Sequence, residues 1–347
     1  MLTDGRVEDG VLHFNFEFTR AHSRDDRARM LEALLLNLKE RWPGPVVPNV
    51  MVEGVRRGGG PAPAQPPPPG KEKAPKDPVR GMSGPGMQAH GGPVQLQPIE
   101  GVRHVIAVAS GKGGVGKSTI ATNLAVALAH AGHAVGLMDA DIYGPSLPLM
   151  MNVQGRPVAN AKRQVIPLMS YGVKCMSIGF MVDDTEPIIW RGPMVMGVVR
   201  QFLQDVAWAP LDVLVVDLPP GTGDAQLTMI QNVPIAGAVI VTTPQDIALL
   251  DANRGLEMFR KLDVPVLGVV ENMSWFELPD GGRMHPFGEG GGARMAARYG
   301  VDLLGRIPLD GAIREGGDSG TPVALGSGAA AVTFAHIARV VAAKLGL

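Results

Sequence analysis

The chain has 347 residues, of which 45% are hydrophobic, enough for one large domain with a substantial core and a smaller one beside it. Its 32 basic and 33 acidic residues give a net charge of -1, which excludes a general attraction to nucleic acid or acidic membranes. The only cysteine, Cys175, excludes an intrachain disulfide and indicates a reducing compartment. No secretory signal and no apolar run of about 18 residues is present, so we expect a cytoplasmic protein without a transmembrane segment.

Residues 1–56 predict a small, truncated β-α-β lobe of α+β type. Residues 11–18 alternate polar with apolar side chains, as in a half-buried strand. Residues 23–38 begin with the potential cap Ser23 and continue with leucines at helical spacing, which predicts a helix. Residues 50–55 then fit a return strand.

Residues 57–97 are rich in Gly, Pro, Lys and Gln and lack apolar periodicity. This composition is typical of a linker. The proline run at residues 66–69 leaves a second interpretation open, because such runs also bind aromatic-lined recognition domains. Most proline-rich runs are spacers, so the linker is the favoured interpretation.

Residues 98–347 predict an α/β domain with a doubly wound, mostly parallel sheet. Nearly continuous apolar runs alternate there with helical stretches, as expected of strands that are covered on both faces. The predicted strands are residues 104–109, 134–138, 213–216, 238–242 and 266–270.

The first of these strands runs directly into a glycine-rich loop, and a helical stretch follows at once. The loop and the first helical residues are Gly111, Lys112, Gly113, Gly114, Val115, Gly116, Lys117, Ser118 and Thr119. Glycines let backbone N–H groups turn toward a phosphate, and the helix N-terminus adds partial positive charge. Lys117 can reach the β and γ phosphates, and Ser118 would bind Mg²⁺ through its hydroxyl. The order of strand, loop and helix favours an ATP-binding phosphate loop over a glycine-rich turn without a ligand.

The lysine at the second position of this loop, Lys112, cannot easily bend back to the phosphates of its own loop. It can reach a phosphate that is bound to a facing subunit. We therefore expect Lys112 to act across a homodimer, as a finger residue supplied in trans does. The alternative is a solvated surface lysine.

Acidic residues follow two of the predicted strands. Asp139 and Asp141 follow one of them, and Asp217 follows another. Carboxylates just past the carboxyl ends of parallel strands lie in the crevice where ligands bind in this architecture. We predict that Asp141 orients the attacking water, that Asp139 supports the Mg²⁺ shell and that Asp217 holds Mg²⁺ through water. Gly221 can offer its amide to the γ-phosphate as a movable switch; taken singly, either acidic segment could instead cap a helix.

Several motifs occur together between residues 101 and 347. They are SGKGGVGKST at 110–119, DADIYGPS at 139–146, WRGPMV at 190–195, DLPPGTGDAQLT at 217–228, TTPQDIAL at 242–249, ENMSWF at 271–276 and FGEGGG at 287–292. This combination resembles the Mrp/ApbC family of iron–sulfur cluster carriers, within the MinD/ParA-type ATPases that have a deviant Walker A loop. The resemblance implies a homodimer that hydrolyses Mg-ATP and transfers clusters to recipient proteins. It also implies that Asn272 contacts adenine; the competing interpretation is a buried amide that satisfies the loop backbone.

The chain departs from this family at the cluster ligands. The family places two cysteines, separated by two residues, soon after the ENMS segment, and the two copies in a dimer together hold one 4Fe–4S cluster. Here these positions are Leu278 and Gly281. A cluster needs about four ligands, normally thiolates, and a dimer of this chain offers only Cys175 twice. Cys175 lies in an alternating stretch that indicates a strand, where a free cysteine is usually a small core residue.

Two other functional classes remain open at this stage. One is a nucleotide-switched scaffold or positioning protein of the MinD/ParA type that holds no cluster. Membrane attachment would need an amphipathic anchor, but the apolar stripe of Phe334, Ile337 and Val341 has little basic company, so we expect it to pack on the core. The other is a small-molecule kinase, for which no sequence feature marks an acceptor pocket.

Overall fold

The computed structural model describes residues 2–8, 11–18, 46–52, 96–181 and 192–347. The chain divides into two compact units, Met1–Met87 and Gln88–Leu347. The predicted helix at residues 23–38 lies outside the described residues, as do the first two residues of the WRGPMV motif and all but the last two residues of the predicted linker.

The N-terminal unit contains a three-stranded sheet in the order β1-β2-β3. The strand predicted at residues 11–18 is present as β2 (Val11–Phe18), and β3 (Val46–Val52) runs parallel to it. The sequence did not predict β1 (Leu2–Glu8), because its Asp4 and Gly5 are typical of turns; antiparallel pairing with β2 outweighs that preference. The return strand also begins four residues before the predicted position. Pro48 reads as a strand breaker, but an edge strand tolerates proline.

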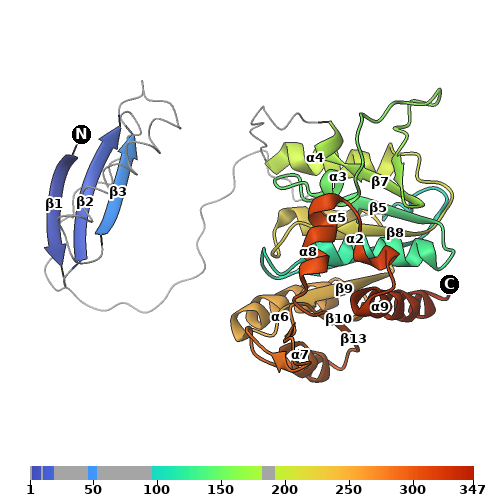
Figure 1. The fold of residues 1–347 in the computed structure, drawn as a ribbon. Helices are drawn as coiled ribbons and strands as arrows, with labels where there is room; N and C mark the ends of the chain where they lie inside the picture. The colour runs from blue at the N-terminus through green and yellow to red at the C-terminus, as the bar shows by residue number, and fades with distance from the viewer. Residues whose placement is uncertain (1, 9–10, 19–45, 53–95, 182–191) are drawn as a thin grey trace, which may run out of the picture. The chain divides into compact units, whose positions relative to one another are not determined.

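The larger unit is built on an eight-stranded sheet in the order β13-β10-β9-β4-β8-β5-β7-β6 (Figure 1). Every pairing in this sheet is parallel except that of β6 with β7. The strands are β4 (Val102–Ser110), β5 (Val135–Asp139), β6 (Leu168–Ser170), β7 (Val173–Ser177), β8 (Leu211–Asp217), β9 (Gly237–Thr242), β10 (Val266–Glu271) and β13 (Leu303–Arg306). The predicted doubly wound α/β fold is therefore confirmed, with each of the five predicted strands in place.

Helices cover both faces of this sheet. They are α2 (Lys117–His130), α3 (Leu147–Met150), α4 (Gly192–Gln204), α5 (Asp224–Asn232), α6 (Asp246–Lys261), α7 (Gly291–Tyr299), α8 (Gly311–Ser319) and α9 (Ala329–Leu345), with 3-10 turns η1 (Ile178–Phe180) and η2 (Val323–Leu325). In the central strand β4, Ile106 and Val108 pack in the same core as α2 and α9, whereas Val105 and Ala107 pack in the core formed with α4, α5, α6 and α7. This division follows from the two-residue period of a strand, because successive side chains point to opposite faces.

The C-terminal helix α9 packs on the core, as predicted. Phe334, Ile337 and Val341 are fully buried in the same cluster as the apolar residues of α2. Cys175 is likewise fully buried, on β7. No helix in the described part of the chain is long and apolar enough to cross a bilayer.

A small antiparallel hairpin follows β10 and consists of β11 (Phe276–Glu277) and β12 (Arg283–Met284). It carries Leu278 and Gly281, the two positions at which the resemblance places cysteines.

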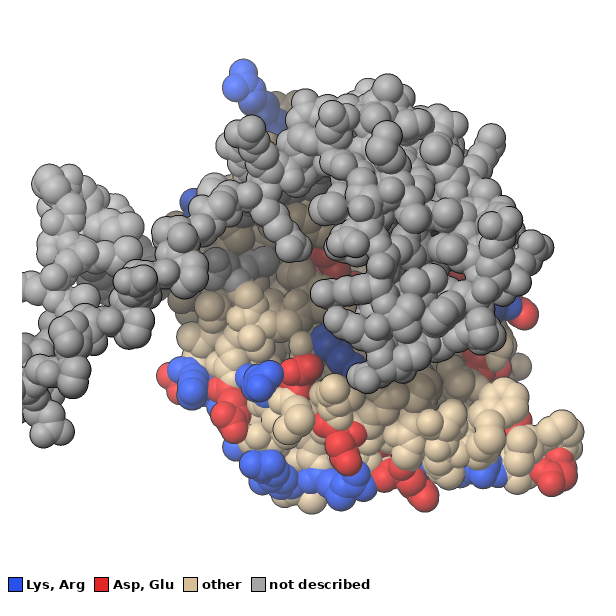
Figure 2. All heavy atoms as spheres, turned by 90° about the vertical axis from the view of Figure 1, so that its left-hand side faces the viewer, with Lys and Arg blue, Asp and Glu red and all other residues tan. Residues whose placement is uncertain are grey.

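On the face of the molecule seen in Figure 2, basic and acidic side chains lie interspersed among uncharged residues.

Candidate functional site

The phosphate loop connects the carboxyl end of β4 to the first residue of α2. Gly116 has a φ of 84°, a left-handed conformation that glycine adopts without strain, and a Cβ there would lie 2.2 Å from Nδ2 of Asn272. A Cβ on Gly111 would lie 2.1 Å from the backbone carbon of Asp251 in α6. The glycines therefore serve two purposes: they shape the loop, and they let α6 and the segment after β10 pack directly against it.

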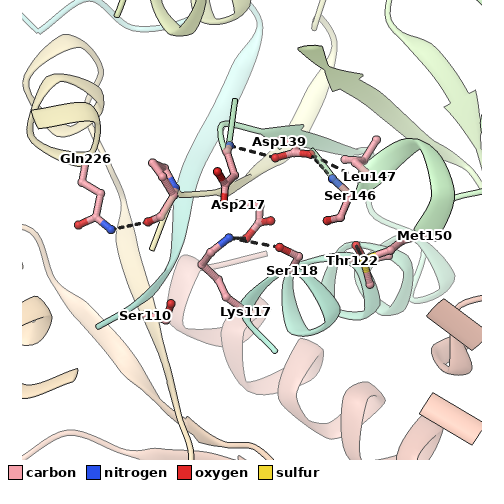
Figure 3. Close-up of polar contacts among 12 residues, drawn as sticks. Ser110, Lys117, Ser118, Thr122, Asp139, Ser146, Leu147, Met150, Asp217 and Gln226 are labelled. Atoms are coloured by element: carbon pink, nitrogen blue, oxygen red, sulfur yellow. Dashed lines mark hydrogen bonds and ion pairs between the residues drawn. The ribbon is translucent and has the colours of Figure 1, made fainter. Parts of the chain in front are cut away.

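Lys117 and Asp217 form a buried ion pair at the centre of the site (Figure 3). The Nζ of Lys117 lies 2.5 Å from Oδ1 of Asp217, and the two side chains are only 6% and 4% exposed. The same ammonium donates a hydrogen bond of 3.3 Å to Oγ of Ser118. Asp217 is the last residue of β8 and pairs in register with Asp139 at the end of β5. The ends of β5 and β8 and the start of α2 thus come together. They carry four residues with predicted roles in binding ATP and Mg²⁺, namely Lys117, Ser118, Asp139 and Asp217.

Asp139 holds the segment that follows β5. Its Oδ1 accepts a hydrogen bond from the amide of Asp141 at 3.0 Å. Its Oδ2 accepts bonds from the amides of Ser146 and Leu147 and from the hydroxyl of Ser177. Sequence reasoning missed this positioning role, because Ser177 comes from a different strand, β7. A contribution of Asp139 to a magnesium shell stays a prediction.

Both acidic side chains of the DADIYGPS motif have raised pKa values. Burial, and then the nearby carboxylate of Asp217, raise the pKa of Asp139 to about 7, although the hydrogen bonds that it accepts and Lys117 act in the opposite direction. Burial also raises the pKa of Asp141, which is half-buried, and Lys117 opposes that shift. A carboxyl group that is partly accessible and has a raised pKa is suited to orient a water and accept its proton. The catalytic role of Asp141 stays a prediction.

The loop between β8 and α5, residues 218–223, is here called the switch loop. Gly221 has a φ of 95°, and its amide donates a hydrogen bond of 3.0 Å to the carbonyl of Ser110 at the end of β4. Contact with a γ-phosphate, as the sequence predicts, would require this bond to break. Figure 3 also shows Gln226, a residue of α5 without a predicted role, directed toward this loop.

Lys112 is half-buried, and its ammonium makes no ion pair or side-chain hydrogen bond within the described ranges. Its backbone carbonyl accepts a hydrogen bond of 3.0 Å from Oγ of Ser110. The backbone of Lys112 is thus held by this hydrogen bond, while its ammonium has no partner among the described residues. This arrangement leaves the predicted role across a dimer possible, and that role stays a prediction.

A cavity of about 380 Å³ adjoins the phosphate loop. Its lining includes Gly116, Thr119, Asn272, Met273, Leu309 and Arg314. The Nδ2 of Asn272 donates a hydrogen bond of 2.9 Å to the carbonyl of Val115, so the amide does satisfy the loop backbone, as the competing interpretation held. Asn272 also faces this cavity, and a contact with adenine therefore stays a prediction. A larger cavity of about 460 Å³ lies between the C-terminal end of α2 and α9 and includes no residue of the phosphate loop.

The hairpin positions that carry cysteines in the family form a tight turn here. The amide of Leu278 donates to the carbonyl of Gly282 at 2.8 Å, and the amide of Gly281 donates to the carbonyl of Leu278 at 2.9 Å. The side chain of Asp280 closes the turn by accepting from the amide of Gly282 at 2.9 Å. These residues offer no thiolate, which is the ligand that an iron–sulfur cluster requires.

The remaining thiol cannot take their place. Cys175 is fully buried, and burial raises its pKa to about 12, so that it stays protonated. The described residues contain no group of three or more His, Cys, Asp or Glu side chains that could hold a metal ion. The donor set of the described chain therefore does not fit a 4Fe–4S cluster.

Comparison with known proteins places the chain in a family. The model of the NUBPL iron-transfer P-loop NTPases, of ParA type, matches residues 101–342. The iron–sulfur cluster transfer protein NUBPL of Mus musculus is 54% identical over 254 residues, which are 72% of this chain and 80% of that protein. The iron–sulfur cluster carrier protein of Synechocystis is 51% identical over 261 residues, which are 72% of this chain and 73% of that protein.

Solved structures agree with this assignment. A nucleotide-binding protein from Archaeoglobus fulgidus in complex with ADP is 38% identical with a TM-score of 0.59, over 66% of this chain and 91% of that one. The cell division ATPase MinD of Pyrococcus furiosus is 25% identical with a TM-score of 0.51, over 69% of this chain and 98% of that one. The resemblance drawn from the motifs is thus confirmed. Since the family model spans most of the chain and close relatives share more than half of the aligned residues, the chain belongs to the NUBPL iron-transfer family of P-loop NTPases.

Proposed function

We propose that the chain binds and hydrolyses Mg-ATP as a homodimer, and that this ATP cycle opens and closes the dimer. The observation that carries this proposal is the buried contact of Lys117 with Asp217 and Ser118 at the N-terminus of α2. The hydroxyl and the carboxylate are oxygen donors of the kind that Mg²⁺ prefers, and bound Mg²⁺ would offset the charge of the phosphates. Lys117 would then turn from Asp217 to the β and γ phosphates, while the loop amides hold the remaining oxygens.

The other predicted residues have separate tasks in this proposal. Asp141 orients the attacking water, and Gly221 donates its amide to the γ-phosphate. Lys112 of the facing subunit supplies the cation that stabilises the transition state. The nucleoside would enter the cavity of about 380 Å³ beside Gly116, where Asn272 lies next to the base.

Calorimetry of the purified chain tests the binding step. We expect saturable heat on titration with Mg-ATP, and a doubling of the molar mass in light scattering with a non-hydrolysable analogue. No heat of association in any buffer would contradict nucleotide binding. Saturable heat with a molar mass that stays at the monomer value would contradict the dimer.

The family resemblance implies that this cycle serves cluster transfer to recipient proteins, and that task is one candidate. The hairpin favours a second candidate, a nucleotide-switched scaffold that holds no cluster of its own, because Leu278 and Gly281 form a hydrogen-bonded turn without thiolates. Both candidates retain the ATP cycle. They differ in whether the chain itself carries iron and sulfide.

Anaerobic reconstitution with iron and sulfide separates the two candidates. We expect the wild-type chain to show no stoichiometric cluster absorption after desalting, because its only thiol is buried and protonated. The measurement is absorption together with iron and sulfide analysis. One cluster per dimer in the wild type would establish the carrier and exclude the cluster-free scaffold.

A matched variant makes a negative result meaningful. Leu278→Cys combined with Gly281→Cys restores the two family positions, and cluster absorption in this variant would show that the reconstitution itself works. The second substitution carries some strain, because Gly281 has a φ of 81°.

A further inference from the structure

The switch loop is anchored on its upstream side. The amide of Leu218 donates to the carbonyl of Val108 at 3.1 Å, which extends the pairing of β8 with β4. The carbonyl of Pro219 accepts a hydrogen bond of 2.6 Å from Nε2 of Gln226, in the first turn of α5 (Figure 3). A side chain of α5, the helix that follows the switch loop, is therefore hydrogen-bonded to the start of that loop.

The environment of Gln226 shows that this contact is a specific constraint. The side chain is only 1% exposed, and its Oε1 is buried without a hydrogen-bond partner among the residues that the structure describes. Burying an unpaired amide oxygen costs free energy that an apolar side chain of similar size would avoid. A buried polar side chain that leaves one of its atoms unpaired needs a compensating role. For Gln226, that role is the hydrogen bond that its Nε2 donates to the carbonyl of Pro219.

The downstream side of the loop is held much less. Pro219 and Pro220 have restricted φ angles, which stiffens the part that Gln226 grips. Beyond them, Thr222 and Gly223 are exposed, and the amide of Gly221 is bonded only to the carbonyl of Ser110. The carbonyl of Gly223 accepts a hydrogen bond of 3.3 Å from the amide of Leu227, at the start of α5. Between the clamped proline pair and this first bond of the helix, the bond from Gly221 to Ser110 is the hydrogen bond that the structure shows for residues 221–222.

We propose that Gln226 is a positioning residue for the switch loop. It clamps the carbonyl of Pro219 so that only residues 221–222 move when the amide of Gly221 exchanges its bond to Ser110 for one to a bound phosphate. The phosphate step rests on the proposed function, whereas the clamp concerns the protein alone. With Pro219 fixed, the amide of Gly221 arrives in one position, which is the requirement for a preorganised hydrogen-bond donor.

Gln226→Met tests the clamp. Methionine is similar in length and removes the unpartnered oxygen together with the donor. The first change offsets the loss of a donor to the carbonyl of the half-buried Pro219, so we expect the thermal midpoint to stay nearly unchanged. In hydrogen exchange without nucleotide, the amides of Leu218 and Gly221, which are the hydrogen-bonded amides of the switch loop, should exchange about tenfold faster, because one anchoring hydrogen bond is lost. The amides of β8 should not change. With ATP, kcat should fall by about tenfold while the affinity stays within about twofold, because the loss affects positioning of Gly221 and not binding.

Met229→Ala is the matched control. Met229 is also buried on α5 but makes no contact of this kind, so its truncation should lower the thermal midpoint without a selective change in exchange of the switch loop. Equal acceleration of the loop by both variants would overturn the clamp, as would unchanged exchange in Gln226→Met. If the wild type binds no ATP, the proposed bond from Gly221 to a phosphate is wrong. Hydrogen exchange of the switch loop without nucleotide still tests whether Gln226 holds Pro219.

Discussion

Replacing Lys117 with alanine is expected to abolish binding of Mg-ATP. Among the described residues, this ammonium is the only cation in contact with Asp217, and in the proposed function it moves to the β and γ phosphates. Its removal leaves Asp217 and Asp139 as neighbouring buried carboxylates without that cation, which would repel a triphosphate as well as fail to bind it. Calorimetry with Mg-ATP is the measurement, and we expect no saturable heat.

The same substitution should destabilise the protein, and this effect has to be separated from the loss of binding. Removing one partner of a buried ion pair costs roughly 3–5 kcal/mol, because the other charge stays buried. We therefore expect Lys117→Ala to unfold at a lower temperature. The double variant Lys117→Ala with Asp217→Asn removes the uncompensated charge and should recover much of this stability, without recovering ATP binding.

The outcome for the double variant decides the interpretation. A folded double variant that binds Mg-ATP within about tenfold of the wild type, a difference of only about 1.4 kcal/mol, would contradict the role of Lys117 at the phosphates. Lys162→Ala serves as the control for loss of a lysine, because Lys162 is an exposed residue outside the site. It should change neither stability nor affinity.

Replacing Lys112 with alanine should have a different effect, namely loss of hydrolysis with binding retained. The ammonium of Lys112 has no partner within the described part of its own chain, so its removal should leave the fold and the affinity for ATP nearly unchanged. A cation supplied in trans to a phosphoryl transition state contributes on the order of 10³ or more to turnover. Steady-state hydrolysis should fall by that factor, and equal hydrolysis by wild type and variant would refute the role.

Mixing two inactive variants tests whether Lys112 acts across the dimer. Asp141→Asn should lack the group that orients water but keep Lys112. In a mixed dimer with Lys112→Ala, one site then has its own Asp141 and receives Lys112 from the other chain. Equimolar mixing should restore up to about a quarter of the wild-type rate, because half of random dimers are mixed and each has one complete site. No recovery, with mixed dimers shown to form, would contradict action in trans.

Several properties of the site could be predicted from sequence because they depend on local order. The phosphate loop lies between an apolar strand and a helix in the chain itself, and Asp139 and Asp217 end the strands in which they occur. A parallel sheet then places such strand ends at one edge, whatever the details of packing. The buried position of Cys175 followed in the same way from the alternating pattern around it.

Other features could not be predicted, because they depend on which side chains meet after folding. Asp139 was expected to support Mg²⁺, and the structure shows that it holds the segment after β5 with help from Ser177. The sequence offered a buried amide that satisfies loop backbone as one interpretation of Asn272, but not its partner, the carbonyl of Val115, which lies 157 residues away in sequence. No periodicity or motif spacing specifies such a contact.

The sequence by itself determined the fold class, the phosphate loop, the acidic strand ends and the absence of the cysteine pair at Leu278 and Gly281. Each of these is a local pattern of residue types, and periodicity and backbone preference act over short distances along the chain. Only the tertiary structure decided that Lys117 pairs with Asp217, 100 residues away, and that Gln226 grips Pro219. Those contacts depend on the register of neighbouring strands and on burial, which exist only once the sheet and its helices have packed together.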